Sequence, residues 1–347
     1  MKRVQTCESL VLIGTEWTQL RYRDILGNTA EVMMEDFAGI SNSGCVAEVM
    51  FEGVTRRSFV PGRDYELDEK NGRIRRTPNS TMPDYTNSVF YGKEVFNHEE
   101  YNGRWGNYPY MVYISYIYES SDNQLVEDDA RHIACQWNGP RPERTLRRLM
   151  AGESLNYLVY GDSISTGCEA LYLKDTYFAR FADRLQRVTG GTVNICNASI
   201  GGETSREGVA RFEAALQTHD PDLVSIAYGM NDMCVKPGRP TDLTVEQYTD
   251  NIRTMLNMAR AHGAEVILIT NCLPNPRWCY TSAAHKEFAV GLRKLAKEEQ
   301  VPLADVQALW ERELAHGKTL SDLLLNDVNH PTSYGHYLYA AMLETLI

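Results

Sequence analysis

A serine, a histidine and an aspartate in the second half of this 347-residue chain could together carry nucleophilic catalysis. Ser163 follows an apolar run at 157–160, a pattern typical of a buried strand that ends in a tight turn. A serine hydroxyl becomes a strong nucleophile only when an adjacent base removes its proton. His330 is the candidate base, and Asp327 could fix its tautomer and stabilise its charged form from the same loop. Taken singly, Ser163 and Asp327 could also be ordinary turn residues.

The same chemistry needs hydrogen-bond donors for the oxyanion that forms on the attacked carbonyl. The backbone N–H groups of Ser163 and Gly202 and the side-chain amide of Asn231 are the candidates. Gly202 has no side chain to block the approach of a substrate. Asn231 and its neighbour Asp232 could instead cap a following helix.

Alternating strand and helix signals from residue 154 onward predict how these residues come together. The predicted strands are 157–161, 192–196, 222–228, 264–270 and 301–305. Apolar residues at spacings of three and four predict helices between them, and a closing helix begins at residue 333. Repeated strand–helix units form a parallel sheet with helices on both faces, so the fold class is α/β. Loops at the carboxyl ends of such strands converge on one crevice.

Four short blocks in this region carry a resemblance to a known superfamily. Gly161-Asp162-Ser163-Ile164, the Gly-Gly pair ending at Gly202, the Gly-Met-Asn-Asp run at 229–232 and the Asp-Val-Asn-His run at 327–330 resemble the blocks of the SGNH/GDSL hydrolases. They occur in the superfamily's order, and the resemblance covers residues 157–347. It implies a flavodoxin-like three-layer α/β/α fold and a serine esterase that needs no metal or cofactor. It also implies Ser163 as nucleophile, Gly202 and Asn231 as oxyanion donors, and an Asp327–His330 pair.

Residues 1–140 show a different pattern, with short Val-, Tyr- and Phe-rich segments between turn signals. The segments 46–51, 72–75 and 110–118 are predicted strands, and no long helix is expected. This pattern predicts an N-terminal β-sandwich, jelly-roll-like domain. The acidic stretch 127–132 is expected to be a solvated loop. A linker with a short helix would span 141–153, followed by the hydrolase domain at 154–347.

Aromatic residues gather between positions 85 and 137, where they could stack on sugars or fill a core. Packing is the favoured interpretation, because aromatic side chains are mostly buried. Superfamily members with an N-terminal β-domain resemble carbohydrate esterases that remove acetyl groups. The sequence therefore predicts hydrolysis of short-chain O-esters, acetyl first, on a carbohydrate through an acyl-enzyme. A lipase or thioesterase, an acyltransferase and a sugar-binding protein with a vestigial site are the alternatives.

Three further residues are predicted to contact the substrate. Asp162 adjoins Ser163, while Trp278 and Tyr280 follow the fourth predicted strand and could wall the site. A packing role is equally open for Trp278 and Tyr280.

Composition narrows the partners of this chain. The net charge of −11 argues against a nucleic-acid backbone or an anionic membrane as the main partner and favours neutral or cationic substrates only weakly. The predicted partner, a small-molecule or glycan ester, follows from the resemblance. No signal-peptide pattern and no apolar run of transmembrane length are visible, so a cytoplasmic location is expected. Most of the eight scattered cysteines, Cys168 and Cys234 included, are expected to be thiols and not a disulfide framework or a zinc site.

Overall fold

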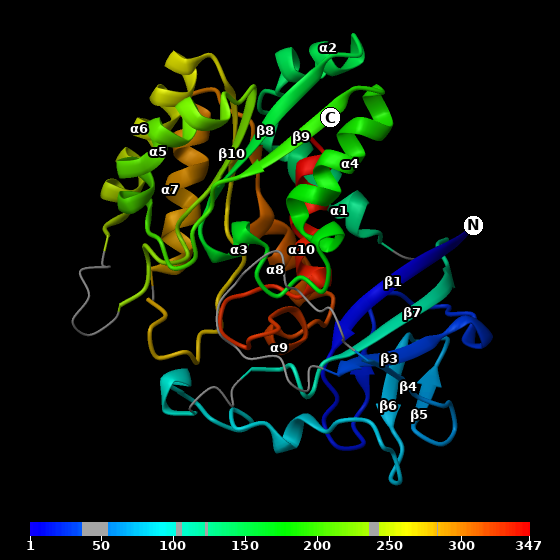
Figure 1. Ribbon diagram of the computed structural model, residues 1–347. Helices are drawn as coiled ribbons and strands as arrows, with labels where there is room; N and C mark the ends of the chain where they lie inside the picture. Colours follow the sequence, from blue (N-terminus) through cyan, green and yellow to red (C-terminus); the bar gives the residue numbers. More distant parts are fainter. Residues whose placement is uncertain (37–54, 102–105, 122–123, 236–242, 283) are drawn as a thin grey trace.

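The computed structural model describes residues 1–36, 55–101, 106–121, 124–235, 243–282 and 284–347 (Figure 1). The predicted strand at 46–51 and Cys45 lie outside these residues. Within them, no helix has the length and apolar character needed to cross a bilayer.

A five-stranded parallel sheet forms the centre of the second half of the chain. Its strands are β8 (Ser154–Gly161), β9 (Thr192–Asn197), β10 (Leu223–Ala227), β11 (Glu265–Ile269) and β12 (Leu303–Ala304). They are arranged in the order β12-β11-β10-β8-β9, and every neighbouring pair is parallel. The predicted α/β class and the five predicted strands are confirmed. In this order the chain moves to opposite sides of β8, so the β8–β10 edge is the switch point where such sheets bind ligands.

Helices cover both faces of this sheet. Helix α6 packs between α5 and α7 on one face. Helices α4, α8 and α10 lie on the opposite face together with α1 (Val126–Trp137) (Figure 1). The helices of this half are α2 (Glu143–Met150), α3 (Ser163–Thr166), α4 (Tyr177–Thr189), α5 (Ser205–His219), α6 (Val245–His262), α7 (His285–Glu298), α8 (Val306–Ala315), α9 (Leu320–Leu323) and α10 (Ser333–Glu344). Capping boxes begin α5 and α6, where the Thr204 and Thr244 side chains accept backbone N–H bonds. The closing helix predicted from residue 333 is α10.

The first half of the chain contains two antiparallel sheets. One has the order β1-β7-β3-β4, and the other β2-β6-β5. The strands are β1 (Lys2–Leu10), β2 (Thr18–Gln19), β3 (Glu31–Asp36), β4 (Thr55–Ser58), β5 (Tyr65–Asp68), β6 (Arg73–Arg76) and β7 (Val112–Glu119). The strand-rich character of this half and the predicted strands at 72–75 and 110–118 are confirmed. Its jelly-roll topology stays a prediction.

One helix contradicts the expectations for this half. Helix α1 (Val126–Trp137) includes the acidic stretch that we expected to be a loop. Val126, Ala130 and Ile133 are buried at helical spacing, and Glu127 and Asp128 carry negative charge in the first turn, where the helix dipole favours it. The run of charges concealed this apolar face in the sequence.

The two halves of the chain share one core. A single cluster of buried apolar residues includes Leu10 and Ile114 from the N-terminal strands together with Leu158 and Leu343 from the parallel-sheet half. Strand β1 also contacts α9 and α10. The predicted boundaries at 140 and 154 stay a prediction, and α2 occupies most of the predicted linker.

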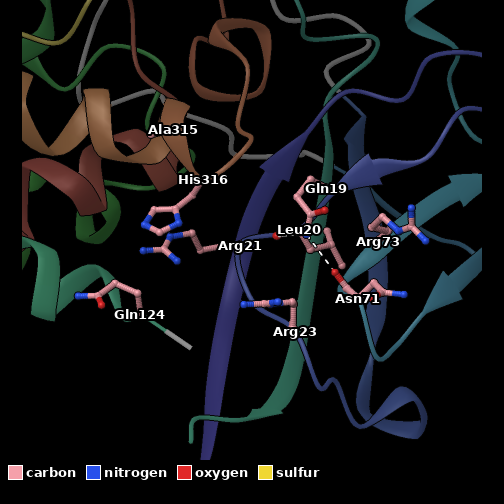
Figure 2. A pocket seen from close by; sticks show the side chains of 9 residues that line it. All are labelled: Gln19, Leu20, Arg21, Arg23, Asn71, Arg73, Gln124, Ala315 and His316. Carbon is pink, nitrogen blue, oxygen red and sulfur yellow. Dashed lines mark hydrogen bonds between the residues drawn. The ribbon is translucent and has the colours of Figure 1, made fainter. Parts of the chain in front are cut away.

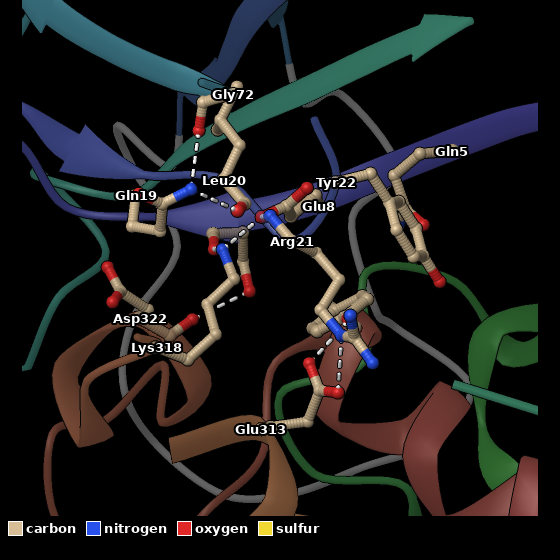
Figure 3. Close-up of polar contacts among 12 residues, drawn as sticks. Gln5, Glu8, Gln19, Leu20, Arg21, Tyr22, Gly72, Glu313, Lys318 and Asp322 are labelled. Atoms are coloured by element: carbon tan, nitrogen blue, oxygen red, sulfur yellow. Dashed lines mark hydrogen bonds and ion pairs between the residues drawn. The ribbon is translucent and has the colours of Figure 1, made fainter. Parts of the chain in front are cut away.

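Buried charges reinforce this contact between the halves (Figure 3). Glu8 of β1 forms an ion pair with Lys318, and both side chains are almost inaccessible to solvent. Tyr116 of β7 donates its hydroxyl to the other Glu8 oxygen at 2.6 Å. Arg21 bonds through Nε to Glu313 of α8 at 2.7 Å, with both side chains again buried. Each charge therefore meets an opposite charge from the other half of the chain.

Candidate active site

The nucleophile candidate lies at the switch point of the parallel sheet. Strand β8 ends at Gly161, and Ser163 is the first residue of α3. A Cβ at Gly161 would lie 2.4 Å from the Ala227 carbonyl oxygen of β10, so the two strand ends approach too closely for a side chain. Asp162 accepts the Ile164 N–H at 3.0 Å and thereby caps α3. This turn places the Ser163 side chain beyond the carboxyl end of β8.

The structure brings Ser163 and His330 together. Ser163 Oγ lies 2.8 Å from His330 Nε2, a distance suited to direct proton transfer. His330 comes from the loop between α9 and α10, and its backbone N–H bonds to Asn326 Oδ1 at 2.9 Å. The same Asn326 oxygen accepts the Val328 and Asn329 N–H groups, which fixes the turn. The predicted contact between serine and histidine is therefore present.

Asp327 does not occupy the predicted position beside His330. Its backbone is left-handed, with φ of 57°, and its carboxylate is fully buried in another direction. Tyr85 donates to Oδ2 at 2.7 Å and Ser321 to Oδ1 at 2.8 Å, with Asn275 Nδ2 at 3.4 Å. Burial raises the pKa of Asp327 above its ordinary value. The predicted Asp327–His330 pair is wrong in this structure, because other donors hold the aspartate.

A different carboxylate faces the histidine. Glu169 Oε1 lies 3.2 Å from His330 Nδ1, on the ring nitrogen opposite Ser163. Glu169 has a left-handed backbone, with φ of 68°, in the turn that follows α3. Tyr108, from the first half of the chain, donates its hydroxyl to Oε2 of the same carboxylate. No spacing in the sequence pointed to Glu169, since the contact joins residues 161 positions apart.

Of the predicted oxyanion donors, Gly202 lies in a turn that borders the serine. A Cβ built on Gly201 would lie 3.7 Å from Ser163 Cβ, so the Gly201–Gly202 turn passes beside the nucleophile candidate. Gly202 has a φ of 80°, which glycine adopts without strain, and the space around its α-carbon is open. Asn231 Nδ2 donates one hydrogen to the Glu203 carbonyl at 2.9 Å. Because an amide nitrogen carries two hydrogens, the other stays available.

The three residues predicted to contact substrate are buried instead. Asp162 has no exposed surface, and burial raises its pKa to about 7. Trp278 donates Nε1–H to His98 Nδ1 at 3.0 Å, and Tyr280 donates its hydroxyl to Glu99 at 3.0 Å. Trp278 and Tyr280 also belong to a buried apolar cluster. The prediction of substrate contact is wrong for Asp162, and the packing role is the one that the structure shows for Trp278 and Tyr280.

Comparison with known proteins identifies the family of this chain. A family model described as the GDSL-like Lipase/Acylhydrolase family matches residues 159–338. The chain belongs to this family. Thioesterase 1/protease 1/lysophospholipase L1 of Escherichia coli is 31% identical over 168 residues, which cover 48% of this chain and 74% of that protein. An arylesterase of Vibrio mimicus is 30% identical over 175 residues, covering 50% of this chain and 78% of its own.

Two solved structures share the fold of this GDSL-like hydrolase. A variant of Axe2, an acetyl-xylooligosaccharide esterase from Geobacillus stearothermophilus, has a TM-score of 0.50 at 23% identity, covering 56% of this chain and 95% of that one. The two-domain esterase CEX, active on acetylated mannans, has a TM-score of 0.50 at 24% identity. That match covers 59% of this chain and 51% of CEX. The family membership supports an acyl hydrolase.

The cysteines of this GDSL-like hydrolase include one correction. Cys168, next to Glu169, is disulfide-bonded, contrary to the expectation of a thiol at this position. Cys234 is a buried thiol that donates to the Met230 carbonyl at 3.1 Å. The absence of a close cysteine pair in the sequence concealed the disulfide. Among the described residues, no group of three or more His, Cys, Asp or Glu side chains is placed to hold a metal ion.

A buried histidine supports the turn that carries Glu169. His336 Nε2 lies 3.0 Å from the Cys168 carbonyl oxygen and donates to it, and burial lowers the pKa of His336 to about 4. An unfolded histidine titrates near 6.5. The folded state therefore favours the neutral ring, and stability is lost as the pH falls from about 6.5 toward 4.

We expect this histidine to account for part of the acid sensitivity of the hydrolase. Between pH 7 and 4.5, His336 should lower the free energy of unfolding by roughly 2 kcal/mol. His336→Gln keeps a hydrogen-bond donor but cannot titrate, so its free energy of unfolding should fall less over this range. Urea unfolding of both proteins at the two pH values measures the difference. Equal losses in wild type and variant would contradict the assignment.

A hollow in the protein surface lies away from Ser163 and His330. It has a volume of about 560 Å³, and Figure 2 shows Arg21, Arg23, Arg73 and His316 around it. Arg21 is already bonded to Asp129 and Glu313, and Arg73 to Asp68. Neither Ser163 nor His330 lines it. This hollow is therefore separate from the candidate active site.

Proposed function

We propose that this protein is a serine esterase that hydrolyses short-chain O-esters, acetyl first, on a carbohydrate through an acyl-enzyme. The observation that carries the proposal is the 2.8 Å contact between Ser163 Oγ and His330 Nε2 at the switch point of the sheet. Independent turn residues would rarely reproduce a nucleophile, a base and adjacent oxyanion donors in one place.

The chemical steps follow from these positions. His330 takes the Ser163 proton as the serine oxygen attacks the acyl carbonyl, and the carbonyl oxygen becomes an oxyanion. The Ser163 and Gly202 N–H groups, for which no acceptor is found in the described part of the chain, would stabilise that oxyanion with the second Asn231 hydrogen. His330 then returns the proton to the leaving alcohol oxygen. A water molecule, activated by the same imidazole, hydrolyses the acyl-enzyme and restores the serine.

The choice of an acetylated carbohydrate rests on analogy. The solved structures that share the fold act on acetylated xylooligosaccharides and acetylated mannans, and the chain carries a β-rich N-terminal half. At these identities the likeness shows the fold alone. Of the aromatic side chains that could have formed a sugar platform, Tyr85, Phe90 and Phe96 are buried, whereas Tyr91 is exposed.

A thioesterase or aryl esterase is the second candidate. The relatives with 30% identity or more include proteins named Thioesterase 1/protease 1/lysophospholipase L1, Arylesterase and Esterase TesA. The two candidates differ in the acyl group and in the leaving group, whereas the catalytic residues are the same.

A substrate series decides between these functions. We expect p-nitrophenyl acetate to be hydrolysed faster than the butyrate and octanoate, and acetylated xylo- and manno-oligosaccharides to lose acetate. Ser163→Ala should abolish turnover of every ester, because it removes the hydroxyl that lies 2.8 Å from His330 Nε2. Faster cleavage of octanoate or of acyl thioesters would favour the thioesterase. Product analysis with a sugar acceptor would reveal an acyltransferase, and sugar binding without turnover would indicate a vestigial site.

A further inference from the structure

We propose that Glu169, held by Tyr108 of the N-terminal half, is the carboxylate that positions His330, in place of the Asp327 expected from the sequence blocks. This inference rests on the proposed function, since it assigns a role toward the same catalytic base. It also makes the N-terminal half a structural part of the active site and not an accessory to it.

The first step of the argument is the geometry around the imidazole. Glu169 Oε1 lies 3.2 Å from His330 Nδ1, while Ser163 Oγ lies 2.8 Å from Nε2. A carboxylate on Nδ1 keeps the proton on that nitrogen and leaves Nε2 free to accept the serine proton. The negative charge then stabilises the imidazolium that forms. Glu169 therefore has the geometry and the charge that the role requires.

The second step is that the Glu169 carboxylate is held on its other side. Tyr108 donates its hydroxyl to Oε2, and burial raises the pKa of Tyr108 well above its ordinary value, so it stays a donor. The backbone of Glu169 is fixed as well. The Cys168 N–H bonds to the Ser163 carbonyl at 3.2 Å, and His336 holds the Cys168 carbonyl.

The third step is that Tyr108 is itself locked against the loop that carries the histidine. Asn107 Nδ2 donates to the Ser321 and Leu324 carbonyls, each at 2.9 Å, and its N–H to the Leu325 carbonyl at 2.7 Å. Gly106 has a φ of 97°, and a Cβ there would lie 3.3 Å from Asn326 Cα. The segment 106–108 thus packs directly on the histidine loop.

The last step concerns the carboxylate that this assignment replaces. Both Asp327 oxygens already accept hydrogen bonds, from Tyr85 and Ser321, and the carboxylate is completely buried. Reaching His330 would require it to leave these donors and to reverse a left-handed backbone. The structure shows Asp327 joining η2 (Tyr85–Asn87) to the α9 region, which is a structural role.

The test compares Glu169→Gln with Asp327→Asn in the full-length protein. In Glu169→Gln an amide replaces the carboxylate and can donate to Nδ1, which forces the proton onto Nε2. We expect kcat on p-nitrophenyl acetate to fall roughly 10²- to 10⁴-fold, as when a triad carboxylate becomes an amide. Tyr108→Phe frees the carboxylate to move and should lower kcat roughly ten- to a hundredfold. Asp327→Asn should leave kcat close to wild type.

A pH titration supplies a readout that a merely structural role would not change. Among the described residues, Glu169 contacts the imidazole, Tyr108 contacts the Glu169 carboxylate, and the charge of His330 acts on His336. Loss of the Glu169 charge should move the acidic limb of the kcat/KM profile, and the NMR titration of the His330 ring, to lower pH. Asp327→Asn should change neither. Thermal unfolding of each variant verifies that it is folded.

The outcomes separate this inference from the proposed function. If Ser163→Ala abolishes turnover while Asp327→Asn causes the large loss and Glu169→Gln does not, the esterase stands and our assignment of Glu169 is overturned. If Ser163→Ala stays active, the proposed nucleophile is wrong. The NMR titration still judges Glu169 in that case, because it needs no substrate, and an unchanged His330 titration in Glu169→Gln would overturn the assignment.

Discussion

His330→Ala is expected to lower kcat for ester hydrolysis by on the order of 10⁴- to 10⁶-fold, a loss as large as that expected for Ser163→Ala. The imidazole lies 2.8 Å from Ser163 Oγ, and the serine hydroxyl is a weak nucleophile without a base. A stopped-flow assay with p-nitrophenyl acetate should also lose the initial burst, since the acyl-enzyme no longer accumulates.

A double variant tests whether the two residues act as one unit. Ser163→Ala with His330→Ala should be no slower than either single variant, because each substitution alone already removes the activated nucleophile. His132→Ala is the matched control, since His132 is exposed on α1 and contacts Gln136. Its kcat should equal that of wild type. Losses that multiply in the double variant would show that His330 acts separately from Ser163.

Lys318→Met is expected to cause the largest loss of stability. It leaves the Glu8 carboxylate buried without its ion-pair partner, and breaking a buried pair costs about 3–5 kcal/mol of unfolding free energy. Tyr116 and the Arg21 N–H continue to bond Glu8, but neither carries the charge that Lys318 supplies to it. Urea unfolding followed by circular dichroism measures the change.

A double-mutant cycle isolates the pair itself. Glu8→Gln with Lys318→Met removes both charges and should cost less than the sum of the two single variants. Arg187→Met is the control, because Arg187 pairs with Asp183 on α4 where both side chains are more than half exposed. Such a surface pair contributes about 0–1 kcal/mol. A loss for Lys318→Met as small as that of the control would show that the pair does not join the two halves.

Much of the catalytic half was predictable from local patterns. Apolar runs that end in Gly, Asp or Asn marked the strands, and apolar spacings of three and four marked the helices between them. Because parallel strands place their carboxyl ends at one edge, Ser163 and His330 could be expected to meet although 167 positions separate them. These inferences need only the period of the side chains and the topology that follows from it.

The carboxylate partner of His330 was not predictable in this way. The spacing of Asp327 and His330 places both on one loop, but the direction of the Asp327 side chain depends on a φ of 57° and on the hydroxyl of Tyr85, 242 positions away. The orientation of the Glu169 side chain likewise depends on the hydrogen bond from Tyr108, in the other half of the chain. Trp278 and Tyr280 are buried for the same reason, because they contact His98 and Glu99, which are distant in the sequence.

The amino-acid sequence by itself therefore determined the sheet, its switch point, and the serine and histidine that meet there. Those features follow from residue types repeated at short range. Only the tertiary structure decided which acid faces the imidazole and how the N-terminal half joins the site. A buried carboxylate is stable only where hydrogen-bond donors compensate for its loss of solvation. Tyr85 is such a donor for Asp327 and Tyr108 for Glu169, and each tyrosine is far from its partner in the sequence.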